Sequence, residues 1–70
     1  MNITRKPVRS SNIKSVGHDA KTNTLQVEFH NGQVWEYPAD AAQHKAMVSA
    51  PSVGSYFHQN IRPLGGEQVS

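Results

Sequence analysis

The strongest structural signal in this sequence is a β-hairpin in the middle of the chain. In Thr24–His30, three apolar side chains alternate with polar ones, and a period of two is typical of a strand with one buried face. The dipeptide Asn31-Gly32 follows, which is a strong short-range turn signal. The next run, Gln33–Tyr37, is rich in β-branched and aromatic residues that favour strands. The sequence therefore predicts two antiparallel strands joined by a short loop.

Burial of apolar side chains predicts the register of this hairpin. A two-residue loop would place a glutamate opposite Val27, on the apolar face of the sheet. A three-residue loop over residues 30–32 instead pairs Val27 with Trp35 and Leu25 with Tyr37, so that all four side chains share one face. We therefore predict the three-residue loop, with its glycine in the left-handed position of a bulge turn.

The remaining elements follow from weaker local signals. A third strand is predicted at Asn12–His18, upstream of the hairpin. Asp40 is a candidate helix N-cap with a glutamine three residues later, and the helix formers of Ala41–Ala50 end at a proline. Ser52 is a second candidate N-cap and opens a short helix over Val53–Gln59. The predicted fold class is α+β: a three-stranded antiparallel β-meander followed by two short helices packed on one face.

Length and composition indicate one small domain. A chain of 70 residues buries only about 60% of the surface that its unfolded form exposes. It contains no cysteine, so neither disulfides nor thiolate-bound zinc can supplement the core. No run approaches the roughly 18 apolar residues of a membrane span, and we expect a monomeric, cytoplasmic protein. We expect residues 1–7 to form a basic flexible N-terminal arm, 8–64 a single domain and 65–70 a disordered C-terminal tail.

Several short motifs follow one another between Val8 and Arg62. They begin with a Ser-Ser pair, continue through Leu-x-Val-x-Phe and Gly-x-x-Trp-x-Tyr, and end with Ala-x-Ser-x-Gly-x-Tyr-Phe and Ile-Arg. The residues that carry them are Ser10, Ser11, Ile13, Gly17, Asp19, Leu25, Val27, Phe29, Gly32, Trp35, Tyr37, Ala50, Ser52, Gly54, Tyr56, Phe57, Ile61 and Arg62. In this order and spacing they resemble the KTSC domain, which is found at the C-terminus of some lysyl-tRNA synthetases and as small stand-alone proteins of bacteria and phages.

The resemblance implies no catalytic site and, by association with a synthetase, an accessory role around RNA. The chain departs from the family pattern at three places. His18 stands where an aromatic residue is usual, Ala39-Asp40 where Val-Pro is usual, and His44 where a tyrosine is usual. A binding surface built on those family aromatics would therefore be altered in this chain.

Three short segments are candidates for binding a phosphate group. Ser10-Ser11 can ligate an anion through hydroxyls and adjacent amides, or can form a strand-entry turn that satisfies its own backbone. Ser52 and Gly54 open the second helix, whose N-terminus either presents unpaired amides to an anion or is simply capped by the serine. Arg62 can contact a phosphate or a base edge, or can complement the dipole at the end of the helix.

The aromatic and histidine side chains are interpreted as structural. We expect Trp35, Tyr37 and Phe57 in the core, with Tyr56 the aromatic residue most available to stack on a base. The four histidines include no pair four residues apart and are predicted to be independent, with no metal ion and no cofactor. The chain has no G-x-S-x-G sequence and no obvious pair of acids, so enzymatic activity is not expected.

The sequence thus predicts a non-catalytic accessory binding module that associates with RNA or tRNA. The predicted nucleic-acid contacts are Arg5, Lys6, Arg9, Ser10, Ser11, Lys14, Ser52, Gly54, Tyr56 and Arg62. The alternative is a small bacterial or phage protein-protein adaptor or regulator that binds a host enzyme or a protein of the translation or transcription machinery. Its contact surface would be the exposed strand Asn12–His18 or the groove between helix and sheet.

Overall fold

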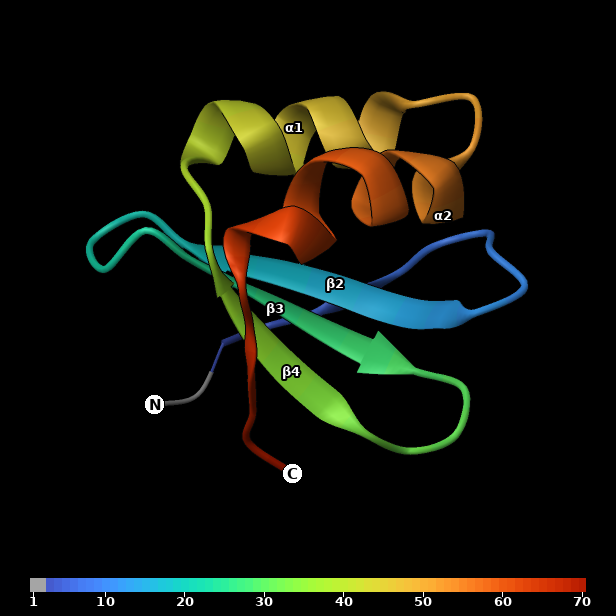
Figure 1. Cartoon of the computed structure of the whole chain (residues 1–70), viewed down its shortest axis with the longest axis horizontal. Coiled ribbons are helices and arrows are strands. Elements are labelled where there is room, and N and C mark those ends of the chain that lie inside the picture. The colour runs from blue at the N-terminus through green and yellow to red at the C-terminus, as the bar shows by residue number, and fades with distance from the viewer. Residues whose placement is uncertain (1–2) are drawn as a thin grey trace.

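The computed structural model describes residues 3–70, which form a five-stranded antiparallel sheet with helices on one of its faces (Figure 1). The order of strands across the sheet is their order in the chain. The strands are β1 (Lys6–Pro7), β2 (Ile13–Asp19), β3 (Thr24–Phe29), β4 (Val34–Pro38) and β5 (Glu67–Gln68). The helices are α1 (Ala41–Ser49) and α2 (Val53–Tyr56), and α2 continues into a π-helical turn, η1 (Phe57–Ile61), and a 3₁₀ turn, η2 (Arg62–Leu64).

The α+β class is confirmed, but the sheet has five strands where three were predicted. The two additional strands are two residues long and lie in the segments expected to be a flexible arm and a disordered tail. Lys6 pairs with Val16 of β2, and Gln68 pairs with Trp35 of β4. A strand of two residues shows no hydrophobic period, so only its pairing with an existing edge reveals it. β1 also occupies part of the β2 edge that was expected to be open to a partner strand.

The hairpin has the predicted register. Leu25 pairs with Tyr37, and Val27 pairs with Trp35. Gly32 in the loop has φ 90°, a conformation that glycine adopts without a steric penalty. Both Leu25 and Val27 are 0% exposed, and a slip of one residue would turn both toward the opposite face of the sheet. Burial is therefore the physical reason for the three-residue loop.

Both predicted helix N-caps are confirmed. The Asp40 carboxylate accepts the backbone N–H of Gln43 at 2.8 Å, and the Gln43 side chain accepts the Asp40 N–H at 3.0 Å, which completes the capping box. The Ser52 hydroxyl accepts the backbone N–H of Ser55 at 3.2 Å. These local bonds hold the starts of two short helices above the sheet.

The second helical segment is longer and less regular than the predicted Val53–Gln59. The backbone N–H of Arg62 reaches the Phe57 carbonyl five residues earlier, which is the π-helical pattern. Phe57 and Ile61 are both buried, so the wider turn keeps two core residues on the sheet side. Pro63 has no N–H to continue the pattern, and the chain leaves the helix through the 3₁₀ turn.

The core lies between the sheet and the helices. Its most completely buried side chains are Ile13, Leu25, Val27, Met47 and Ile61. Burial of one such side chain contributes roughly 1.5–3 kcal/mol. No helix within residues 3–70 has the length and apolar character that a membrane crossing requires.

Candidate functional site

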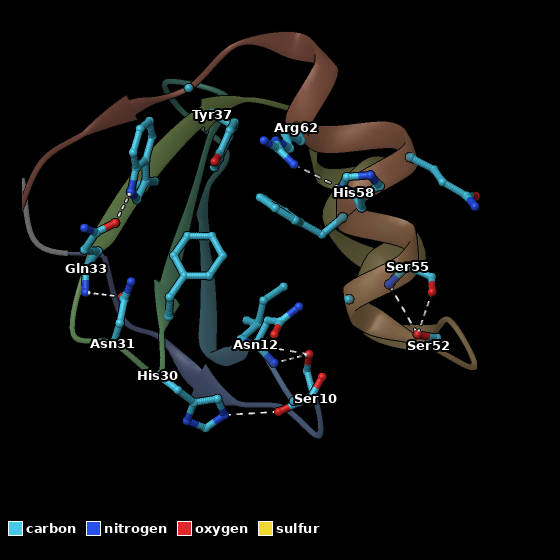
Figure 2. Close-up of a pocket in the computed structure, with 18 of the residues that line it drawn as sticks. Ser10, Asn12, His30, Asn31, Gln33, Tyr37, Ser52, Ser55, His58 and Arg62 are labelled. Atoms are coloured by element: carbon cyan, nitrogen blue, oxygen red, sulfur yellow. Dashed lines mark hydrogen bonds between the residues drawn. The ribbon is translucent and has the colours of Figure 1, made fainter.

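A groove of about 960 Å³ opens at the edge of the core, where the sheet, the second helical segment and the loop before β2 meet (Figure 2). Gln33 and Tyr37 lie on the sheet side, and Ser52, Ser55 and His58 lie on the helical side. The Ser10–Asn12 loop closes the lower end in this view. This is the larger of the two main hollows formed by the described residues.

Six of the ten predicted contact residues meet at this groove. They come from three separate parts of the chain and are Arg9, Ser10, Ser11, Ser52, Gly54 and Arg62. Tyr56 is half-buried and packs against the core instead, so it does not line the groove. Lys6 is exposed on β1. Arg5 and Lys14 line a smaller hollow of about 320 Å³ beside Ser15 and Glu28.

The two serine motifs of the sequence pattern are brought together in space. The Ser10 hydroxyl accepts the backbone N–H groups of Asn12 and Ile13, each at 3.3 Å, in a turn that leads into β2. A Cβ built on Gly54 would lie 3.1 Å from the same hydroxyl oxygen, which is tighter than ordinary contact. A glycine therefore lets α2 approach this loop. The Ser10 hydroxyl thus satisfies two backbone N–H groups of its own turn, as the strand-entry alternative predicted.

Arg62 lies in the groove between Tyr37 and His58 (Figure 2). Its Nη1 donates to Nδ1 of His58 at 3.3 Å, because a guanidinium carries donors only. Burial raises the pKa of the Tyr37 phenol, and the positive charge of Arg62 opposes this effect by lowering the pKa. The Arg62 side chain itself is exposed, so its remaining donors face the groove and the solvent.

The described residues that line the groove include no aspartate and no glutamate. All acidic residues of the chain lie elsewhere, and they are Asp19, Glu28, Glu36, Asp40 and Glu67. Arg9 and Arg62 therefore give the groove a positive charge that no neighbouring carboxylate in the lining offsets. Arg5 has a different environment, since it lies 3.9 Å from a Glu28 carboxylate oxygen.

Arg5 belongs to a polar network on the face of the sheet opposite the helices. Its guanidinium donates to the Ser15 hydroxyl at 3.2 Å and to the side-chain oxygen of Gln26. Gln26 in turn donates to a Glu36 carboxylate oxygen at 3.0 Å. The charge of Arg5 is thus compensated within the fold, on a different face from Arg9. The two arginines are close in the chain, and the sequence therefore predicted a shared role for them.

Three aromatic side chains of the strands, Phe29, Trp35 and Tyr37, line the sheet side of the groove. The rings of Trp35 and Tyr37 are stacked, with centroids 6.4 Å apart and an interplanar angle of 19°. Phe29 meets Phe57 edge-to-face at 5.5 Å. Trp35 was expected in the core, but it is only half-buried and lines the groove. The position of Trp35 near the hairpin loop could have indicated this exposure, because two short helices cannot cover the whole face of the sheet.

The prediction that all four histidines are independent is wrong for two of them. The rings of His18 and His44 are stacked 5.4 Å apart at 11°, between β2 and α1. His18 Nε2 lies 2.7 Å from the Ala39 carbonyl oxygen and donates to it. Burial, and then the neighbouring His18, lower the pKa of His44. The described residues contain no group of three or more side chains placed to hold a metal ion.

The sheet, the helices on one face and the groove at their junction define a small α+β domain. A family model described as the KTSC domain matches residues 9–64. The chain therefore belongs to the KTSC domain family, and the resemblance of its motifs is confirmed.

One solved structure and two further proteins are similar to this chain. The crystal structure of a KTSC domain protein from Yersinia pestis superposes with a TM-score of 0.89 at 28% identity, covering 99% of this chain and 100% of that one. An uncharacterized protein of Stutzerimonas stutzeri is 34% identical over 62 residues, which is 84% of each chain. A lysine–tRNA ligase of Trichormus variabilis is 37% identical over 51 residues, which is 71% of this chain but 9% of that protein. The last likeness is therefore to one small part of the ligase.

Proposed function

We propose that this protein is a non-catalytic accessory module that binds single-stranded RNA in the groove. The observation that carries the proposal is the charge of the lining, where two arginines face a surface without carboxylates. Phosphates are favoured there, because Arg9 and Arg62 can each donate charge-assisted hydrogen bonds to phosphate oxygens. Hydroxyl and amide side chains around them supply neutral donors that suit the sugar–phosphate backbone.

The proposed contacts are therefore centred on the groove. Ser11 and Ser52 are exposed at its rim, and Gly54 keeps the helix close to the loop. Lys6 on β1 and Lys14 on β2 are exposed and do not line the groove, and we assign them a secondary, long-range role in attracting RNA. Arg5 and Tyr56 are left out of the direct contact surface, because one is paired with Glu28 and the other packs on the core.

The similarity to part of a lysine–tRNA ligase supports tRNA as the RNA ligand, because that relative is an enzyme named for a tRNA substrate. Such a role is accessory, since the domain accounts for a small part of that relative. We further propose a cytoplasmic location, where RNA is available to bind, and a monomeric state.

Binding of a fluorescently labelled single-stranded RNA, measured by anisotropy across a range of salt concentrations, tests the proposal. On single strands each phosphate neutralised contributes about −0.7 to the log–log salt slope, so Arg9 and Arg62 together predict about −1.4. Arg62→Gln should weaken binding and reduce this slope by about 0.7. Lys45→Gln is the matched control, because Lys45 is exposed on α1, does not line the groove and carries the same charge.

Two results would contradict the proposal. One is the absence of any binding even at low salt. The other is an equal loss with Lys45→Gln and Arg62→Gln, which would mean that net charge and not the groove attracts RNA. In the first case the adaptor alternative takes its place, with a protein ligand in the same groove.

A further inference from the structure

On the sheet side of the groove, the rings of Trp35 and Tyr37 are stacked on each other. We infer that this wall binds one unpaired nucleobase on the indole of Trp35. This inference rests on the proposed RNA-binding function and adds to it the part of the ligand that is recognised. Phosphate contacts alone would bind any polyanion, whereas an aromatic face selects a strand whose bases are free to stack.

The indole of Trp35 is held in place from within the protein. Tyr37 lies two residues further on the same face of β4, and its ring is stacked 6.4 Å from that of Trp35. The indole N–H donates to the side-chain oxygen of Gln33 at 3.2 Å, so the polar edge of the ring is satisfied. A ring that is already oriented loses little conformational freedom when a ligand stacks on it.

The two rings of this wall, those of Trp35 and Tyr37, differ in how far they are buried. Tyr37 is 6% exposed and meets Phe57 edge-to-face at 5.2 Å, so the second helical segment covers it. Trp35 lies nearer to the hairpin loop and is only half-buried. A tryptophan that packed solely for stability would gain more from complete burial. The uncovered part of the indole is therefore available to a planar ligand.

Polar groups lie on both sides of this surface. The side-chain oxygens of Asn31 and Gln33 accept hydrogen bonds from the Gln33 amide and the Trp35 indole, at 2.9 and 3.2 Å. Their NH₂ groups form no hydrogen bond with the described residues and can donate to acceptors on a base edge. Arg62 projects from the opposite wall, where a phosphate of the same strand would lie (Figure 2). A single strand supplies both features, because planar bases and phosphates alternate along it.

Trp35 is the chain's single tryptophan, so its fluorescence reports directly on this site. The probes are a short oligouridylate and an abasic ribose-phosphate oligomer of equal length and charge. We expect the oligouridylate to quench the fluorescence and to bind about 5-fold to 100-fold more tightly than the abasic oligomer. With labelled oligomers and anisotropy, Trp35→Phe should keep most of this preference and Trp35→Leu should lose it, while amide NMR spectra verify that both variants are folded.

The outcomes distinguish the two levels of the proposal. Equal affinity for both oligomers, with the salt dependence retained, overturns stacking on Trp35 and leaves the RNA-binding function standing. Failure of both oligomers to bind overturns the function and the stacking together. If Trp35→Leu does not fold, the comparison of the two oligomers with the unmodified protein decides the question alone.

Discussion

Substitution of Gly17 by alanine is expected to displace the N-terminal segment from the sheet. A Cβ built on Gly17, in β2, would lie 2.4 Å from the Thr4 carbonyl oxygen and 2.8 Å from Cγ2 of Ile3. Ordinary contact begins at 3.4 Å, so the Thr4 carbonyl would have to retreat by about 1.0 Å. The nearest obstacle is backbone, and no side-chain rotation relieves it. The segment that precedes β1 would therefore separate from β2.

The free energy of this change is limited by what the segment contributes when it is docked. Arg5 hydrogen bonds to Ser15 and Gln26, and such bonds contribute about 0.5–1.5 kcal/mol each. Its ion pair with Glu28 joins side chains that are 29% and 23% exposed and adds about 0.2–1 kcal/mol. After the entropy of ordering the segment is subtracted, we expect Gly17→Ala to lower the free energy of unfolding by about 1–3 kcal/mol. For a domain of this size the melting temperature falls by about 4–24 °C.

Urea denaturation of two matched pairs of chains measures this effect. The control places the same substitution in a chain that begins at Val8, where Ile3 and Thr4 are absent. In that background alanine should be neutral, or stabilising by up to about 1 kcal/mol, because it restricts the unfolded chain. An equal loss of stability in both backgrounds would refute the reasoning, since the clash would then lie elsewhere.

Three further changes test the histidine pair, the C-terminal strand and the second cap. Burial, and then His18, lower the pKa of His44 in the folded protein, so its contribution to the free energy of unfolding is fully present above the unfolded pKa of 6.5 and is lost as the pH falls through the lowered folded pKa. Urea denaturation from about pH 7.5 to about pH 5 should therefore show a loss of stability. His44→Gln should make the stability less dependent on pH in this range. A Cβ on Gly66 would lie 2.2 Å from the Tyr37 ring, so Gly66→Ala should detach β5 and the residue that follows it. Val69 donates its backbone N–H to the Val34 carbonyl at 2.8 Å, and unchanged hydrogen exchange at this amide would contradict the prediction. Ser52→Ala removes the N-cap of α2 and should cost about 1 kcal/mol of unfolding free energy, whereas no change in the urea midpoint would show that the cap is replaced.

Local signals predicted the parts of the fold that depend on neighbours in the chain. The capping box joins Asp40 to a residue three positions away, and the Ser52 cap does the same. The hairpin register followed from burial on one face and from the loop that contains Gly32. In each case the interacting groups are a few residues apart, so their types and spacing carry the information.

The candidate site was predicted only in part. Ser10 and Gly54 were both singled out, but their contact joins segments more than forty residues apart and appears only in the folded chain. The exposure of Trp35 could not be read from its strand pattern, which places it on the same face as the buried Val27. How far the short helices extend over that face decides whether such a residue is covered.

The sequence by itself determined the hairpin and its register, the two helix starts and the family, because these depend on short spacings and on one alternating pattern. Only the tertiary structure decided which basic residues share a surface. Arg5 and Arg9 are close in the chain, yet one pairs with Glu28 on the helix-free face and the other lines the groove. The tertiary structure also decided that β1 and β5 form, because strands of two residues exist only through hydrogen bonds to the edge of a sheet that has already formed.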